Sequence, residues 1–128
     1  MIPVVTHPER VGVLQDHIGT LAEWVRKGFC LQLTGQSLSG RFGHRARSFS
    51  RELLKRGLVQ FVASDGHDCE DRPPRLDVAF SLVSEQYGAA VAERLFELNP
   101  AAALAGRPLP EPRDEPAAEK SRWWRRGG

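Results

Sequence analysis

The chain has 128 residues, of which 41% are hydrophobic and 27% charged, and this balance is typical of one ordinary globular domain. The formal net charge of +2 comes entirely from residues 107–128, because residues 1–106 hold twelve basic and twelve acidic side chains. A neutral body gives no electrostatic reason to expect a nucleic-acid partner, and no apolar run is long enough to predict a transmembrane segment.

A short apolar strand begins the chain and is followed by a histidine. Residues 3–6 lead into His7, and Pro8 then prevents a helix from starting at once. Glu9 and Arg10 follow at the same end of the strand. A histidine at the end of a single strand is more often structural than a metal ligand, so this segment alone does not define a site.

The next segments alternate between helix and strand. Apolar residues recur every three or four positions from Leu14 to Val25, which predicts an amphipathic helix that ends at Gly28. Residues 29–33 are nearly all apolar, as in a buried parallel strand. Cys30 in this strand and Cys69 in a later loop do not suggest a disulfide framework, which favours a reducing compartment. No signal peptide is predicted, so we expect a cytoplasmic protein.

A polar loop over residues 34–40 leads into a second predicted helix, from about residue 42 to residue 56. This helix is strongly basic: its cationic positions are Arg41, His44, Arg45, Arg47, Arg51, Lys55 and Arg56, opposed only by Glu52. Such a face suits an acidic, phosphorylated tail of a partner protein, but a solvated helix face is the simpler interpretation and composition alone favours it. His17 and His44 lie within helices and are expected to be surface residues.

A third apolar strand over residues 58–63 ends at Ser64 and the sequence Asp65-Gly66-His67. Side chains two residues apart on an extended backbone point the same way, so Asp65 and His67 converge. A carboxylate and an imidazole suit a divalent metal, and α/β folds place active sites at the carboxyl ends of parallel strands. Taken alone the pair is a common surface feature, but His7 at the end of another strand favours a shared metal site.

Two more helices are predicted over residues 76–87 and 89–98, with a last turn after Asn99 and Pro100. The order β-α-β-α-β-α-α predicts an α/β fold with a parallel sheet and right-handed crossovers. Three strands leave two open sheet edges, so the segment resembles part of a larger barrel or sheet.

Residues 107–128 are rich in Pro, Glu and Arg and are predicted to form a disordered tail. The Arg-Trp-Trp-Arg-Arg run near its end either contacts an anionic surface or has no role.

Three motifs in chain order resemble a known family. They are His-Pro-Glu-Arg at residues 7–10, Gln-x4-Ser-Leu-x-Gly-x-Phe-Gly at residues 32–43, and Gly-Leu-Val-x-Phe-x-Ala-Ser-Asp-x-His at residues 57–67, followed by an Arg-Pro pair. The chain is similar over residues 2–106 to the bacterial PHP-type protein-tyrosine phosphatases of the polymerase and histidinol phosphatase superfamily, which serve capsule and exopolysaccharide synthesis. Residues 1–106 would then be a partial phosphatase domain.

The resemblance implies a distorted (β/α)7 barrel that holds a cluster of metal ions, usually manganese, and removes phosphate from a bacterial tyrosine kinase. It assigns His7, Asp65 and His67 as ligands of Mn²⁺ or another divalent metal. It assigns Arg10 and Arg72 as catalytic arginines, and bidentate guanidinium groups do suit phosphoryl oxygens. Supporting positions beside these groups are Glu9, Ser37 and Ser64.

Several departures from the family pattern limit these expectations. The family's first half, with its His-x-His pair, has no counterpart here, so we expect the C-terminal half of a barrel that requires the other half or self-association. Gln60 stands where the family has His, and Gln36 where it has Gly, which would be unfavourable if that turn needs a positive φ. The alternatives are an inactive fragment that acts as a binding or scaffold piece, and the same barrel with another substrate, such as another phosphomonoester or, less in keeping with the neutral body, a nucleic-acid end.

Overall fold

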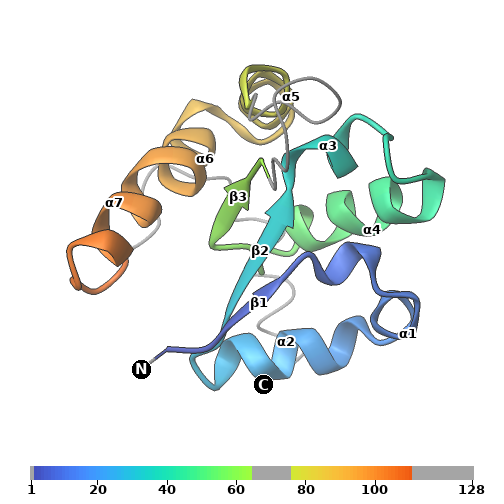
Figure 1. Cartoon of the computed structure of the whole chain (residues 1–128), viewed down its shortest axis with the longest axis horizontal. Helices are drawn as coiled ribbons and strands as arrows, with labels where there is room; N and C mark the ends of the chain where they lie inside the picture. The colour runs from blue at the N-terminus through green and yellow to red at the C-terminus, as the bar shows by residue number, and fades with distance from the viewer. Residues whose placement is uncertain (1, 65–75, 111–128) are drawn as a thin grey trace.

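The computed structural model describes residues 2–64 and 76–110 (Figure 1). Its centre is a parallel sheet of three strands, in the order β1 (Val4–Thr6), β2 (Cys30–Thr34) and β3 (Phe61–Ala63). In the register of the sheet, Val4 pairs with Cys30 and Gln32 pairs with Phe61. The parallel α/β fold predicted from the alternation of apolar segments is therefore confirmed.

Helices connect the strands and continue after the last one. The β1–β2 connection holds η1 (Pro8–Arg10), α1 (Gly12–Gln15) and α2 (Ile18–Arg26), and the β2–β3 connection holds α3 (Gly35–Leu38) and α4 (His44–Lys55). After β3 come α5 (Asp77–Tyr87), α6 (Ala89–Glu93), η2 (Arg94–Leu98) and α7 (Asn99–Leu104). Figure 1 shows α2 and α4 together on one side of the sheet, and α6 to α7 beside β3. None of the helices in this part of the chain is long and apolar enough to cross a membrane.

The core surrounds the central strand. Leu31 and Leu33 of β2 are fully buried. Fully buried leucines from three helical segments pack in the same cluster: Leu21 of α2, Leu53 of α4 and Leu95 of η2. Every residue of β2 is buried except Gln32, which is partly buried, so this strand is covered on both faces, as central parallel strands are. By contrast, Val4 of β1 is 45% exposed, so the sheet is far less covered at β1.

The carboxyl ends of the strands differ from the predicted pattern. Residues 34–40 were expected to be a loop, but Gly35–Leu38 form the short helix α3 directly after β2. The predicted strand over residues 58–63 is regular only from Phe61, because the Gln60 side chain enters the ladder. The Gln60 Oε1 accepts a hydrogen bond from the Leu31 backbone N–H at 2.7 Å, and the Gln60 backbone N–H donates to the Leu31 carbonyl at 3.0 Å.

Two predicted helices are also divided in the structure. The first breaks between α1 and α2, at Asp16 and His17. The predicted helix over residues 89–98 changes from α6 to the π-helix η2 before Pro100 near the start of α7. Proline cannot donate a backbone hydrogen bond, and its ring clashes with the carbonyl four residues earlier, so widening the helix before Pro100 relieves this conflict.

Candidate metal centre

His7 follows β1 at the carboxyl edge of the sheet. Its N–H donates to the Gln32 carbonyl at 2.8 Å, which continues the pairing between β1 and β2. Its φ of 38° and ψ of 54° lie in the left-handed region, and no other non-glycine residue in the described segments has a positive φ. This conformation costs roughly 1–2 kcal/mol for a residue with a Cβ atom. Backbone strain of this kind concentrates at functional sites, so the strain itself marks His7.

The His7 ring carries a second unusual feature. Its Nδ1 atom is buried and has no hydrogen-bond partner among the described residues. A buried polar atom left unpaired costs about 1–3 kcal/mol, and such atoms in native structures call for an explanation. A neutral imidazole nitrogen is the most common protein ligand for transition metals, so this atom fits a bound metal ion.

Glu9 is the fully buried carboxylate of this edge. Its Oε1 accepts hydrogen bonds from the Thr34 N–H and from the Ser37 hydroxyl, both at 2.9 Å. Burial raises the pKa of the Glu9 carboxyl above its ordinary value of 4.5, while these hydrogen bonds act in the opposite direction. Glu9 thus ties η1, which follows β1, to the end of β2 and the start of α3. Two of the predicted supporting residues, Glu9 and Ser37, are in direct contact.

The helix α3 is held close to its neighbours. A Cβ atom at Gly35 would lie 3.0 Å from the Ala79 Cβ and 3.1 Å from a methyl group of Leu76, so α3 and the start of α5 pack too closely for a larger residue without adjustment. Gln36 lies inside α3 and has no positive φ. The condition for an unfavourable Gln36, a positive φ at this position, is therefore not met, because the segment is helical.

Arg10 lies at the end of η1 and stacks on an aromatic ring. Its guanidinium carbon is 3.9 Å from the centroid of Phe42, which immediately precedes the N-terminal turn of α4. A guanidinium that stacks on an aromatic ring contacts the ring with its flat face, and its N–H donors point outward around its edge. The stacking therefore orients the arginine that the resemblance assigns to phosphate. The sequence pattern did not indicate the role of Phe42, because the two residues are far apart in the chain.

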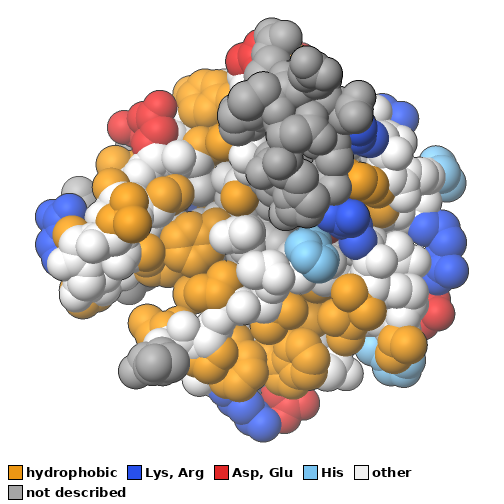
Figure 2. Space-filling model, in the orientation of Figure 1, with side chains coloured by type: hydrophobic (Ala, Val, Ile, Leu, Met, Phe, Trp, Pro, Cys, Tyr) orange, Lys and Arg blue, Asp and Glu red, His pale blue; other side chains and the backbone are white. Residues whose placement is uncertain are grey.

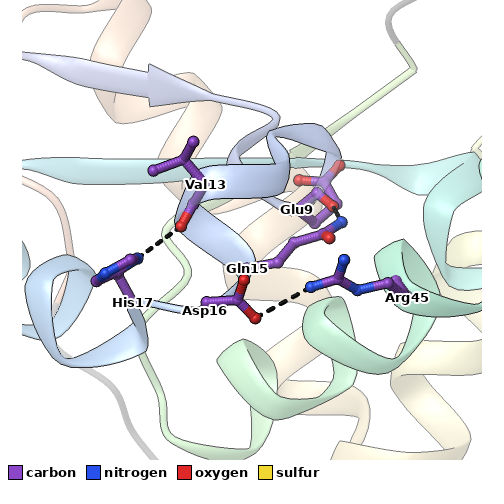
Figure 3. A network of polar contacts seen from close by, with 6 residues as sticks. All are labelled: Glu9, Val13, Gln15, Asp16, His17 and Arg45. Atoms are coloured by element: carbon purple, nitrogen blue, oxygen red, sulfur yellow. Dashed lines mark hydrogen bonds and ion pairs between the residues drawn. The ribbon is translucent and has the colours of Figure 1, made fainter.

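Gln15 is a second contributor that the sequence pattern missed. Figure 3 shows its side chain turned toward Glu9, and its Nε2 donates to the Glu9 backbone carbonyl at 2.6 Å. The same view shows His17 turned away from Glu9, with its Nδ1 2.7 Å from the Val13 carbonyl. His17 and His44 are exposed, as predicted.

The remaining predicted site residues come after β3 in the chain. Asp65, His67 and Arg72 lie outside the described residues, whereas Ser64 is half-buried immediately after β3. Within residues 2–64 and 76–110, no group of three or more His, Cys, Asp or Glu side chains is arranged to hold a metal ion. The structure therefore brings Glu9, two residues along the chain from His7, into contact with Ser37, and the Asp-x-His pair stays a prediction.

Cys30 is unsuited to nucleophilic chemistry. It begins β2, at the opposite end of the strand from the Glu9 contacts, and it is 6% exposed. Burial raises the pKa of its thiol above the ordinary value of 9.0, so the reactive thiolate is scarce at neutral pH.

Taken together, the fold and this edge define a parallel α/β protein with a candidate metal centre at the carboxyl ends of its strands. A family model described as "Capsular polysaccharide synthesis, CpsB/CapC" matches residues 1–105. The chain belongs to the CpsB/CapC family.

Known members of the family share this part of the chain. The tyrosine-protein phosphatase YwqE of Bacillus subtilis is 34% identical over 96 residues, which are 75% of this chain and 38% of YwqE. The tyrosine-protein phosphatase CpsB of Streptococcus pneumoniae is 33% identical over 103 residues, which are 77% of this chain and 42% of CpsB.

A solved structure agrees with the sequence relatives. It is described as one of the crystal structures of YwqE and CpsB, "unique metal-dependent tyrosine phosphatases", and it matches with a TM-score of 0.79 at 30% identity. The match covers 90% of this chain and 47% of that one. The chain thus spans less than half the length of these relatives.

Proposed function

We propose that this chain carries part of the centre of a metal-dependent protein-tyrosine phosphatase, a phosphoric monoester hydrolase. The observation that carries the proposal is His7, whose backbone is strained and whose buried Nδ1 has no partner among the described residues. The names of the relatives supply the reaction class, because YwqE and CpsB are tyrosine phosphatases and the matching structure is called metal-dependent.

In this proposal His7, Asp65 and His67 hold the metal, and Mn²⁺ is the ion we favour. When bound, such an ion would supply a more acidic water and polarisation of the phosphoryl oxygens. Arg10 and Arg72 bind the phosphoryl group, and the stacking of Arg10 on Phe42 orients the Arg10 guanidinium before substrate arrives.

The buried carboxylate has a positioning role in the same scheme. Glu9 links the ends of β1 and β2 through the Thr34 N–H and the Ser37 hydroxyl, so it fixes the segment that carries His7 and Arg10. Ser64 immediately follows β3, as His7 immediately follows β1.

The substrate we propose is a phosphotyrosine protein, in particular a bacterial tyrosine kinase that regulates polysaccharide export in the cytoplasm. The further ligands come from a segment equivalent to the rest of a PHP-type barrel, since the chain spans less than half the length of YwqE and CpsB. Residues 1–106 then form the C-terminal half of the barrel, completed by the other half or by self-association, and residues 107–128 form the tail.

The test is to join this chain to the part of YwqE that it does not cover, and to measure hydrolysis of p-nitrophenyl phosphate and a phosphotyrosine peptide. We expect turnover that depends on added Mn²⁺ and falls more than about 100-fold in His67→Ala and His7→Ala. His17→Gln is the matched control, because His17 is exposed and turned away from Glu9, and it should retain full activity. The YwqE segment alone should be inactive. Absence of turnover, or turnover that survives His67→Ala, would refute the proposal.

A second candidate function is an inactive fragment that serves as a binding or scaffold piece. It is favoured by Gln60, which stands where the family usually has His and whose Oε1 accepts a hydrogen bond from the Leu31 N–H. Titration with Mn²⁺, followed by electron paramagnetic resonance, separates the two candidates. Tight binding that His7→Ala removes supports the metal centre, whereas no binding to the joined protein supports the inactive fragment.

A further inference from the structure

The outer face of α4 borders a groove that lies away from the contacts of Glu9. The groove has a volume of about 260 Å³, and its cationic wall is formed by Arg47, Arg51 and Lys55, with Tyr87 of α5 on the other side. A second groove of about 370 Å³ continues from it along α4 toward Asp16 and Arg45. Figure 2 shows several Lys and Arg side chains on the α4 side of the molecule.

The carboxylates beside these cations are already paired with other arginines. Asp16 lies 3.0 Å from Arg45 (Figure 3), and Glu52 lies 2.9 Å from Arg56. Arg47 and Arg51 form no ion pair with a carboxylate of the described residues, and the Nε atom of Arg47 is buried without a hydrogen-bond partner there. Arg47 and Arg51 therefore keep positive charge that no carboxylate of the described residues neutralises.

The cations have a regular spacing that suits an extended ligand. Arg47, Arg51 and Lys55 follow one another at intervals of four residues in α4. This interval separates neighbouring cations by about 6 Å along the helix axis. Alternate side chains of an extended peptide recur at about 6.6 Å, which is close to the same distance. Like charges four residues apart destabilise a helix slightly, so helix stability does not account for the row.

We propose that this groove binds an extended acidic segment of another protein, with Asp or Glu at alternate positions. Its carboxylates pair with Arg47 and Arg51, and its backbone lies against Tyr87. The Tyr87 hydroxyl donates to the Arg51 carbonyl at 3.2 Å, which fixes that wall of the groove. Composition alone favoured a solvated helix face, and the unpaired arginines beside a hollow change that assessment. The proposal does not rest on phosphatase activity.

The test uses the full chain and a fluorescein-labelled peptide of alternating Glu and Ala, with binding measured by fluorescence anisotropy. We expect Arg51→Gln to weaken binding about three- to fivefold, and Arg51→Lys to retain most of it, because the pairing is ionic. The matched control is Arg45→Gln, which removes the same charge from the same helix but from the arginine paired with Asp16, and it should change binding less than about twofold. Affinity should fall as the salt concentration rises.

A peptide of the same composition with its glutamates in one block should bind more weakly than the alternating peptide. Equal losses in Arg45→Gln and Arg51→Gln would show non-specific attraction and overturn the proposal. It would also be overturned by an absence of saturable binding in both the full chain and its fusion to YwqE. Tighter binding of a single-stranded oligonucleotide, or of phosphatidylserine vesicles, with the same sensitivity to Arg51→Gln, would assign the groove to another kind of partner.

Discussion

Two opposing requirements apply to residue 7. Its left-handed backbone conformation favours glycine, whereas the proposed metal binding requires the imidazole of His7. Glycine adopts the left-handed region without a Cβ clash, so His7→Gly should be more stable than His7→Ala by about 1 kcal/mol. Both variants should lose metal binding. The measurement is the free energy of unfolding from urea denaturation.

The control for His7 is Val13, which is 72% exposed in the ordinary helix α1. There the order should reverse, with Val13→Gly less stable than Val13→Ala by about 1 kcal/mol. If glycine is the less stable replacement at both positions, the left-handed conformation of His7 does not store the strain that we assign to it.

Glu9 tests how a buried carboxylate organises the ends of two strands. Glu9→Gln keeps an oxygen acceptor for the Thr34 N–H and the Ser37 hydroxyl, whereas Glu9→Ala leaves both donors without one. We expect Glu9→Ala to lower the free energy of unfolding by about 2–4 kcal/mol and Glu9→Gln by less than about 1 kcal/mol. Thermal unfolding of the two variants measures the difference. Equal losses would mean that packing, and not hydrogen bonding, holds Glu9.

At the scale of elements, β1 presents its outer side to solvent. Ile2 is 58% exposed and Val4 is 45% exposed, and Figure 2 shows hydrophobic side chains on the face that carries β1 and α2. The Cys30 N–H donates to the Pro3 carbonyl, and the His7 N–H donates to the Gln32 carbonyl. By the alternation of a strand, the backbone groups of Val4 and Thr6 face the other way, as at an open sheet edge.

From the exposure of β1 we predict that the same substitution changes stability very differently at two neighbouring residues, Val4 and Val5. Val4→Lys places a charge on the exposed side and should change stability by less than about 0.5 kcal/mol while reducing self-association. Val5→Lys places the same charge against the core and should cost more than about 2 kcal/mol. Urea denaturation and sedimentation velocity provide the two readouts. A large loss of stability in Val4→Lys would show that the side of β1 that carries Val4 is covered.

The elements that sequence predicted well are those with a strong local pattern. The apolar run of β2 and the three- and four-residue periodicity of α2 and α4 are visible without knowledge of their neighbours. The helix α3 was missed because distant contacts stabilise it, through Ser37 bonded to Glu9 and Gly35 packed against α5. The late start of regular pairing in β3 depends on Gln60, whose side chain accepts a hydrogen bond from the Leu31 N–H.

The candidate site likewise has features that the sequence could predict and features that it could not. The position of His7 after a strand, and the grouping of Glu9 and Ser37 near it, could be predicted from motif order. The left-handed backbone of His7 and the stacking of Arg10 on Phe42 could not, because neither follows from the local pattern of apolar and polar residues.

At the scale of the whole molecule, the two edges of the sheet differ. Beside β3, Asn99 of α7 donates to the Gln60 carbonyl at 2.7 Å, so the chain covers part of that edge itself. On this basis we predict that the isolated chain is poorly stable and that its fusion to the uncovered part of YwqE melts cooperatively at a higher temperature, because added strands pair with β1. Circular dichroism melts of the two proteins measure this difference. A sharp, cooperative melt of the isolated chain as a monomer would contradict the prediction.

The most direct test of the central claim, that the His7 edge is a metal centre, is a crystal structure of the fusion protein grown with Mn²⁺ and measured at the manganese absorption edge. We predict an anomalous peak within coordination distance of a ring nitrogen of His7, with Asp65 and His67 among its other ligands. A peak elsewhere, with the His7 ring hydrogen-bonded to a protein group, would contradict the account.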